Sequence, residues 1–157
     1  MNYIDYFHSP LGWVEIQSSN DAITSVVLRD ELTTFSLNSS PITSNCARQL
    51  AEYFDGSRTT FDLPIHQNGT DFQQGVWNAL KNIPFGKTVS YGYIAKKINN
   101  PKSVRAVGAA NGKNKVWIIV PCHRVIGSDG SLTGYAGGVE RKKWLLIHEA
   151  RGTTFFK

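Results

Sequence analysis

The sequence predicts an α+β protein with a small antiparallel-sheet and helix domain over residues 1–68, then a mostly helical domain over residues 69–157. Short β-rich runs separated by turns fill the first thirty residues, and apolar residues at three- and four-residue spacing dominate the second half. A capping-box pattern at Thr70 and Gln73, directly after Gln67-Asn68-Gly69, marks the predicted boundary.

The composition is that of a globular protein. The chain has 157 residues, of which 41% are hydrophobic and 18% charged, which suffices for one full core or two small ones. No apolar run approaches the roughly 20 residues of a membrane span, and the first ten residues mix polar groups where a signal peptide would be apolar. We therefore expect a cytoplasmic protein without a membrane partner. Cys46 and Cys122 form no disulfide pattern and are interpreted as free thiols.

Charge is divided unevenly between the halves. Residues 1–68 hold three basic and eight acidic side chains, whereas residues 69–157 hold fourteen and four, so the net charges are −5 and +10. A basic half of this size is typical of proteins that bind a polyanion, because each cation that neutralises a phosphate releases counterions. Scattered lysines that only keep the surface soluble would give the same excess. Nucleic acid is the first candidate partner.

The first domain is predicted to contain a sheet and one helix. β-rich runs at residues 12–17 and 23–28 are separated from their neighbours by turns at residues 9–10 and 18–21. Ser44 is the predicted cap of a helix that ends at Gly56. The apolar positions of this helix are Ala47, Leu50, Ala51 and Phe54, and Cys46 beside them is expected to be structural.

Three helices are predicted after Thr70. The first has the core face Phe72, Val76, Ala79, Leu80 and Ile83 and ends at Pro84-Phe85-Gly86. The second covers residues 91–98, and the third begins at Ser103 within three residues of Asn99-Asn100-Pro101, so the pair resembles a helix-turn-helix. We expect Val104, Val107 and Gly108 on the inner face and Arg105, Ala106 and Ala109 on the outer one. Small outer side chains favour close approach to a minor groove, although such helix pairs also serve as simple packing units.

A candidate nucleophile follows the apolar run at residues 116–120, which is predicted to be a buried strand leading to Cys122. A nucleophilic thiol needs a base, and the base needs an orienting group. His123 is adjacent, but neighbouring side chains diverge in an extended chain, so a bridging water is expected between the two. Glu149 shares the stripe of Leu145 and Leu146 on the last helix, and as a buried carboxylate it needs a partner such as His123.

Each of these residues also has an ordinary explanation. A lone cysteine is usually an inert core residue, and a lone histidine is usually a polar group whose hydrogen bonds are made within the protein. Glu149 could equally form an ion pair with a lysine. Only their combination indicates a proton relay. The glycine-rich segment at residues 127–138 is either a plain surface loop or a wall of the substrate site.

Three stretches of sequence resemble the O6-alkylguanine-DNA alkyltransferase family. The resemblance is continuous from about Thr70 to Ala150, and the turn Ser9-Pro10-Leu11-Gly12 is similar to the family's more variable first domain. The stretches are Ile119-Val120-Pro121-Cys122-His123-Arg124-Val125-Ile126-Gly127, Gly134-Tyr135-Ala136-Gly137-Gly138 and Trp144-Leu145-Leu146-Ile147-His148-Glu149.

The resemblance implies a role for individual residues. Cys122 would accept the alkyl group, His123 and Glu149 would complete the water-bridged relay, Asn114 would support it by hydrogen bonding, and Tyr91 would crowd the target phosphate and give a proton to the leaving guanine. Arg105 would fill the vacated base stack. Further DNA contacts would come from Gly92, Asn100 and Ser128, and the base pocket would be lined by Val125, Tyr135 and Ala136.

The implied activity is that of a methylated-DNA–protein-cysteine S-methyltransferase acting by base flipping on double-stranded DNA that contains O6-alkylguanine, or O4-alkylthymine. In-line attack by the thiolate leaves a thioether on Cys122, so one turnover per molecule is expected. The resemblance implies a winged-helix-like second domain, and we expect a monomer with no cofactor. Some relatives bind zinc, but His8, His66 and Cys46 lack ligand spacing, so no metal is predicted.

Three alternatives remain at this point. A non-catalytic alkyltransferase-like protein would bind the lesion without transfer, although Cys122 at the acceptor position argues against it. A helix-turn-helix regulator would use Cys122 as a sensor and would need a symmetric dimer. A cysteine hydrolase with His123 as direct base would turn over repeatedly on an acyl substrate.

Overall fold

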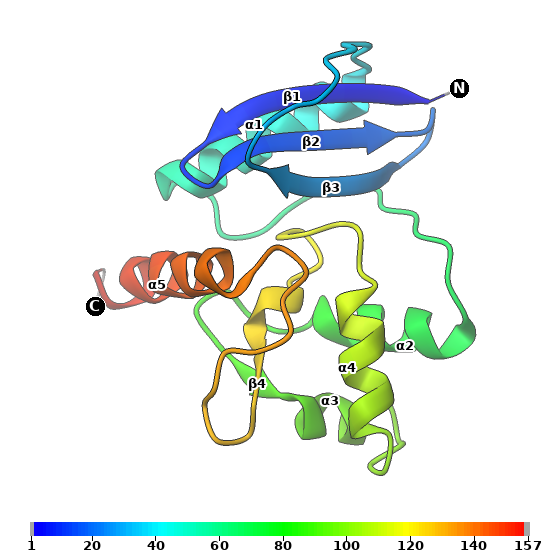
Figure 1. Cartoon of the computed structure of the whole chain (residues 1–157), viewed down its shortest axis with the longest axis vertical. Helices are drawn as coiled ribbons and strands as arrows, with labels where there is room; N and C mark the ends of the chain where they lie inside the picture. The colour runs from blue at the N-terminus through cyan, green and yellow to red at the C-terminus, as the bar shows by residue number, and fades with distance from the viewer. Residues whose placement is uncertain (1, 156–157) are drawn as a thin grey trace. The chain divides into compact units, whose positions relative to one another are not determined.

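The computed structural model describes residues 2–155, with side chains up to residue 151, and it confirms the predicted α+β class (Figure 1). The chain forms two compact units. Unit 1 is the chain up to Asn68 together with Lys115–Trp117, and unit 2 is Gly69–Asn114 together with the chain from Ile118 onward. Within the described residues, no helix has both the length and the apolar character needed to cross a membrane.

Unit 1 is a three-stranded antiparallel sheet with one helix against it (Figure 1). The strands β1 (Tyr3–Ser9), β2 (Gly12–Ser18) and β3 (Ile23–Arg29) follow one another in order, as expected for strands joined by short turns. Apolar side chains of the sheet and of α1 (Pro41–Asp55) close the core, namely Val14, Ile16, Val26, Leu28, Cys46, Leu50 and Tyr53.

Helix α1 begins four residues earlier than predicted. Its cap is Ser40, whose hydroxyl accepts from the Thr43 amide while the Thr43 hydroxyl accepts from the Ser40 amide, so the prediction of Ser44 as cap is wrong. Pro41 at the first helical position fits this start, because its fixed φ suits a helix and no hydrogen bond is lost. The predicted end at Gly56 is confirmed, with φ of +89° at that glycine.

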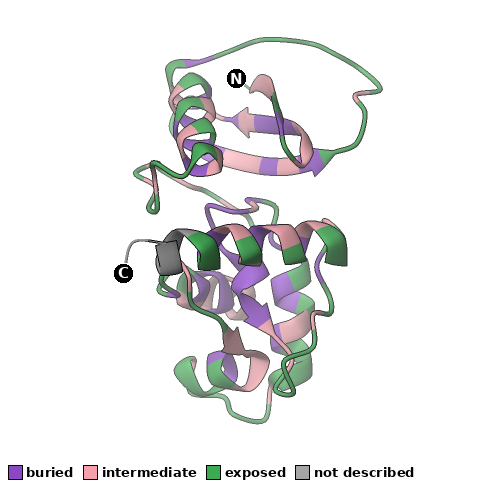
Figure 2. Cartoon of the chain, turned by 90° about the vertical axis from the view of Figure 1, so that its left-hand side faces the viewer, coloured by how far each residue is buried: buried purple, intermediate pink, exposed green. Residues whose placement is uncertain are grey.

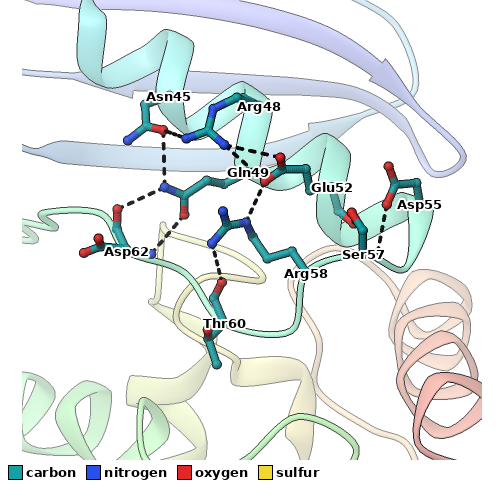
Figure 3. Close-up of polar contacts among 9 residues, drawn as sticks. All are labelled: Asn45, Arg48, Gln49, Glu52, Asp55, Ser57, Arg58, Thr60 and Asp62. Atoms are coloured by element: carbon teal, nitrogen blue, oxygen red, sulfur yellow. Dashed lines mark hydrogen bonds and ion pairs between the residues drawn. The ribbon is translucent and has the colours of Figure 1, made fainter. Parts of the chain in front are cut away.

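The outer face of α1 holds the segment that follows it (Figure 3). Gln49 is buried and pairs with the Asp62 backbone in both directions, accepting at 2.9 Å and donating at 3.0 Å. Glu52 accepts from both Arg48 and Arg58. The Gln49 side chain therefore makes the two backbone hydrogen bonds at Asp62 that a neighbouring strand would otherwise make.

Unit 2 is built from four α-helices, one 3-10 helix and two very short strands in the described part of the chain. These elements are α2 (Asp71–Leu80), β4 (Val89–Ser90), α3 (Tyr91–Lys97), α4 (Val104–Gly112), the 3-10 helix η1 (Cys122–Arg124), β5 (Val125–Ile126) and α5 (Val139–Phe155). The predicted capping box of Thr70 and Gln73 is confirmed at the start of α2. The two strands pair in parallel, and the Trp77 indole donates to the Ala110 carbonyl at 2.9 Å, which joins α2 to α4. In each unit buried positions gather in the interior and exposed ones follow the outer loops (Figure 2).

The inner face of α4 differs from the prediction at one end. Val107 is buried as expected, but Val104 is 42% exposed, and the buried positions that follow are Ala110 and Asn111. Arg105 is exposed, as predicted. The first turn of α4 thus presents an apolar side chain to the surface, and the helix packs through its second half.

Residues 116–120 are buried except for the half-buried Trp117, but the predicted strand is wrong. Val116 makes one isolated bridge to Val26 of unit 1, with the Val26 amide donating to Lys115 and the Trp117 amide donating to Val26. The chain then turns, with Ile118 in the left-handed region at φ of +71°. An apolar run predicts that a segment is buried but not which backbone conformation it adopts, so a buried turn and a buried strand look alike in sequence. Ile118 is a strained position, because a β-branched residue rarely adopts positive φ.

Candidate active site

Cys122 is held in a short 3-10 turn inside unit 2. The residue is 2% exposed, and its Sγ accepts a hydrogen bond from Asn114 Nδ2 at 3.2 Å. The same amide donates to the Val120 carbonyl at 3.0 Å, and Asn111 Nδ2 donates to the Cys122 carbonyl at 3.3 Å. Because Asn111 lies in α4 and Asn114 just beyond its end, that helix fixes both the backbone and the thiol of Cys122.

His123 and Glu149 form a buried pair, as the spacing on the last helix suggested. Their exposed fractions are 0% and 1%, and His123 Nε2 lies 2.7 Å from Glu149 Oε2. Arg124 completes the group with two hydrogen bonds to the same carboxylate, from Nε at 2.7 Å and from Nη2 at 3.0 Å. A third bond from Arg124 Nη1 reaches the Ile83 carbonyl at 2.7 Å. The carboxylate is thus shared between an imidazole and a guanidinium.

The hydrogen-bond pattern determines which ring nitrogen of His123 is basic. Glu149 is an acceptor when ionised, so His123 Nε2 must carry the proton that it donates. Nδ1 is then the atom with the free lone pair, and it is buried without a hydrogen-bond partner among the residues that the structure describes. A buried, unpartnered lone pair on the residue that follows a thiol in the chain is a candidate to receive a proton.

The charges of this group keep Glu149 ionised and His123 neutral. Burial alone would raise the pKa of the Glu149 carboxyl. The hydrogen bonds and charges of His123 and Arg124 lower it by more than burial raises it, so the pKa lies below its ordinary value. For His123, burial lowers the pKa, Glu149 raises it, and Arg124 and Lys142 lower it, with a net decrease. At neutral pH the imidazole is therefore a base.

The Cys122 thiol lies between opposing influences. Burial raises its pKa to about 11, whereas the Asn114 hydrogen bond, the Lys142 charge and neighbouring backbone amides lower it. Burial also raises the pKa of Cys46 to about 12, and the charge of Asp5 raises it as well. Cys122 is thus the thiol that lies beside groups able to stabilise a thiolate.

A second cluster connects Tyr91 to the glycine-rich loop. Tyr91, the first residue of α3, donates its hydroxyl to the Thr133 carbonyl at 3.1 Å. Lys142 of α5 is fully buried and donates to the same carbonyl at 2.9 Å and to the Val125 carbonyl at 2.6 Å. Burial raises the pKa of the Tyr91 hydroxyl, so it is protonated and able to donate.

The predicted pocket residues differ in burial. Val125 is fully buried, and Tyr135 is 7% exposed, with burial raising the pKa of its hydroxyl well above the ordinary value. Ala136 is exposed. The first two belong to the interior of unit 2, and the third lies on its surface.

The predicted DNA-contact residues lie on the surface of unit 2, outside the Cys122 cluster. Asn100 follows α3 and accepts from Ser103 through its carbonyl, whereas Gly92 is a half-buried position within α3. Arg105 and Ser128 are exposed, and Arg105 makes no hydrogen bond or ion pair with any residue in the described part of the chain. An unengaged arginine on the outer face of a helix is available to a partner.

Sequence reasoning missed two charged residues of the site, Arg124 and Lys142. A signal for Lys142 exists, because Lys142, Leu145 and Glu149 follow one another at three- and four-residue spacing and all three are buried. Arg124 has no periodicity signal, since its partners come from distant segments. In the described residues, no three His, Cys, Asp or Glu side chains are grouped in a way that would hold a metal ion.

Two family models match this chain almost end to end. The model described as the ribonuclease-like domain of 6-O-methylguanine DNA methyltransferase matches residues 2–67, and the DNA binding domain of the same family matches residues 71–151. The methylated-DNA–protein-cysteine methyltransferase of Methanosarcina acetivorans is 44% identical over 92% of this chain and 96% of its own length. The constitutive one of Bacillus subtilis is 43% identical over 96% of each chain.

Solved structures show the same likeness. A Mycobacterium tuberculosis O6-methylguanine methyltransferase superposes with a TM-score of 0.86 at 42% identity, covering 100% of both chains. A Mycobacterium tuberculosis OGT in complex with DNA gives a TM-score of 0.84 at 43% identity, covering 97% of this chain and 98% of that one.

Proposed function

The chain belongs to the 6-O-methylguanine DNA methyltransferase family, and we propose that Cys122 is the residue that accepts the alkyl group. The activity is that of a methylated-DNA–protein-cysteine methyltransferase, which repairs O6-alkylguanine in DNA. The observation that carries the assignment to Cys122 is its hydrogen bond from Asn114 beside the buried His123–Glu149 pair. Cys46 lies in the core of unit 1, where burial and the charge of Asp5 both raise its pKa.

His123 Nδ1 takes the proton of the thiol. Nε2 is committed to Glu149, so Nδ1 is the only ring atom with a lone pair to offer. A water molecule bridges Cys122 Sγ and Nδ1 in this proposal. Glu149 holds the tautomer and stabilises the imidazolium that forms, and Arg124 holds Glu149. Asn114 stays with the sulfur and stabilises its negative charge.

The transfer is a single in-line displacement. The thiolate attacks the carbon attached to O6, the new C–S bond forms as the C–O bond breaks, and the electron pair of that bond remains on the guanine. The leaving base takes a proton, for which the Tyr91 hydroxyl is the donor; this requires Tyr91 to leave the Thr133 carbonyl. A thioether does not hydrolyse readily, so each molecule acts once.

Double-stranded DNA is the partner of unit 2. The +10 charge of residues 69–157 supports this, as does the relative solved with DNA. Helix α4 lies along the minor groove, and Arg105 enters the stack in place of the flipped base, which offsets part of the unstacking cost of a few kcal/mol. Gly92, Asn100 and Ser128 contact the DNA beside it, and the protein acts as a monomer.

The flipped guanine is received by Val125, Tyr135 and Ala136. The buried Val125 and Tyr135 supply apolar and aromatic surface, and Ala136 offers its backbone amide to the base oxygen. The same surface accepts O4-alkylthymine, whose alkylated oxygen sits in a comparable position on a smaller ring.

Counting lesions repaired per protein molecule tests this proposal. Increasing amounts of protein are added to a fixed amount of duplex carrying O6-methylguanine, and the remaining lesion is measured after completion. A repaired amount that equals the protein added supports the acceptor mechanism. A larger amount would indicate a hydrolase with turnover, and binding without repair would indicate a damage-recognition protein.

A further inference from the structure

Asn111 carries a buried hydrogen-bond acceptor that lacks a donor. The residue lies in the last turn of α4 and is 2% exposed, and its Nδ2 donates to the Cys122 carbonyl at 3.3 Å. Its Oδ1 is buried and has no hydrogen-bond partner among the residues that the structure describes. Buried polar atoms are nearly always hydrogen-bonded, so an unpartnered one calls for an explanation.

The chemistry of the amide determines which of its two polar atoms lacks a partner. The Cys122 carbonyl can only accept, so the Asn111 amide must present Nδ2 to it, and the reverse orientation would bring two acceptors together. Oδ1 is attached to the same carbon as Nδ2 and therefore lies close to that carbonyl. An unpartnered acceptor is thus located next to the residue that is proposed to take the alkyl group.

The side-chain donors around Cys122 are already used by other acceptors. Asn114 Nδ2 donates to the Val120 carbonyl and to Cys122 Sγ. The charged and imidazole donors of the site bind Glu149 or backbone carbonyls, and they belong to His123, Arg124 and Lys142. A bound molecule can supply the donor that Asn111 lacks.

The lesion base has a single N–H donor. Alkylation of O6 leaves N1 without its hydrogen, N9 carries the sugar, and N3 and N7 are acceptors. The exocyclic 2-amino group is therefore the only N–H donor of O6-alkylguanine, and it lies on the same ring edge as O6, next to N1. When the alkyl carbon meets Cys122 Sγ, this edge lies against the residue whose carbonyl Asn111 binds.

We infer that Asn111 is a specificity-determining residue, whose side-chain oxygen accepts a hydrogen bond from the 2-amino group of the flipped O6-alkylguanine. This inference deepens the proposed function and rests on the proposed role of Cys122 as alkyl acceptor. The burial of Asn111 does not oppose the contact, because Cys122 is also only 2% exposed and has to meet the same base. Entry of the base therefore has to uncover both residues.

This contact favours guanine over thymine as the alkylated base. O4-alkylthymine has no N–H donor, because N1 carries the sugar and alkylation leaves N3 without its hydrogen. With that lesion Asn111 Oδ1 stays unpaired in the closed site, and a site built for a hydrogen bond rejects an analogue that lacks the donor. The protein should therefore act faster on alkylated guanine than on alkylated thymine.

The experiment compares two lesions that differ in one group. O6-methylhypoxanthine has the methylated oxygen and the purine ring of O6-methylguanine but carries hydrogen in place of the 2-amino group. Methyl transfer to Cys122 is measured in single-turnover reactions with excess protein, on duplexes that are otherwise identical. Wild-type protein should react about tenfold to a hundredfold faster with O6-methylguanine, since the analogue leaves a buried acceptor unpaired.

Asn111→Leu removes the acceptor and should remove this preference. The variant also loses the hydrogen bond to the Cys122 carbonyl, which slows transfer from both lesions alike, so the ratio of the two rates isolates the contact with the base. The two rates should then agree to within about twofold. Asn111→Ala, which has a smaller side chain, gives the same comparison if leucine prevents folding.

Asn114→Leu is the matched control. It removes a donor to the Cys122 sulfur and not an acceptor for the base. Transfer from both lesions should therefore slow by the same factor, and the wild-type ratio of the two rates should be kept.

The ratio of rates also distinguishes the base from a buried water as the partner of Asn111. If Oδ1 binds only water, Asn111→Leu keeps the wild-type ratio, and the inference is wrong. Equal rates of the wild-type protein on the two lesions overturn it as well. This wild-type comparison stands even if both substitutions prevent folding, and a ratio of at least about tenfold then supports the inference.

Failure of the inference is separable from failure of the proposed function. If wild-type Cys122 receives the methyl group from O6-methylguanine but the Asn111 variants keep the wild-type ratio, only the role of Asn111 fails. If wild-type Cys122 receives no methyl group from either lesion, the proposed function itself fails.

Discussion

Asn114 Nδ2 lies 3.2 Å from Cys122 Sγ and 3.0 Å from the Val120 carbonyl, so one amide group holds both the thiol and the turn that presents it. Asn114 lies two residues beyond the end of α4, the helix that carries Arg105 on its exposed face. Hydrogen bonds therefore connect the proposed acceptor sulfur to the end of the proposed DNA-binding helix within unit 2.

Replacing Asn114 by leucine should slow alkyl transfer by about tenfold to a hundredfold. A hydrogen bond to a charged group contributes about 1.5–3 kcal/mol, and leucine keeps the volume while removing the donor to the developing thiolate. The rate is measured in single-turnover reactions with excess protein, and thermal unfolding identifies a folding defect. A variant that folds and transfers at the wild-type rate would show that Asn114 does not act on the sulfur.

Local sequence signals predicted the parts of the fold that depend on neighbouring residues. Thr70 and Gln73 cap α2 as expected, and Gly56 ends α1, because caps are made by side chains within four residues. His123 and Glu149 were paired from helical spacing and from the rule that a buried carboxylate needs a partner. Helix spacing also carried the information that α5 has a buried face.

Features that depend on distant segments could not be predicted in this way. Residues 116–120 look like a strand, but Val116 makes only an isolated bridge to Val26 within unit 1, and Ile118 has positive φ. Arg124 donates hydrogen bonds to Ile83 and Glu149, which are far away in sequence. No periodicity in the sequence predicts these contacts. Buried charges are placed by the tertiary structure, since their cost is offset only where partners meet.

Replacing Glu149 by glutamine should destabilise the protein by about 3–5 kcal/mol at neutral pH, because Arg124 is left as a buried charge without an anion. This loss of stability should depend on pH. The pKa of Glu149 is lowered in the folded state, so its contribution is present above the unfolded pKa of about 4.3 and is lost as pH falls through the lower folded value. The difference in free energy of unfolding between wild type and variant should therefore become smaller at acidic pH.

Urea unfolding at several pH values measures this difference. Glu140→Gln, at an exposed position on the same helix, is the control and should unfold like the wild type throughout. A wild-type advantage over Glu149→Gln that stays constant from about pH 7 to about pH 2 would contradict the linkage argument.

Replacing Arg105 by alanine should lower the transfer rate on duplex DNA by about tenfold, because the stack vacated by the flipped base is no longer filled. The side chain is exposed and unengaged among the described residues, so the stability of the protein should not change. The rate of Cys122 alkylation by iodoacetamide should also stay the same, which separates base flipping from thiol chemistry. Lys102→Ala is a nearby exposed control. An equal loss of rate in both variants would indicate general charge attraction only.

Gly134 and Gly130 offer a matched pair of substitutions in the glycine-rich loop. Both have positive φ, +71° and +86°, so alanine at either position should cost about 1 kcal/mol of stability. A Cβ at Gly134 would lie 3.3 Å from the Tyr91 hydroxyl, whereas at Gly130 it meets open space. We expect Gly134→Ala alone to slow transfer, in single-turnover assays, by displacing Tyr91. Equal rates in the two variants would argue against a role for that hydroxyl.

The assignment of Cys122 as alkyl acceptor is tested by the intact mass of the protein before and after incubation with a duplex carrying one O6-methylguanine, with Cys122→Ala as control. We expect wild-type protein to gain the mass of about one methylene group, mapped by peptide analysis to Cys122, and the variant to gain nothing. Methylation of Cys46, or repair of the lesion without any gain in mass, would show that Cys122 is not the acceptor.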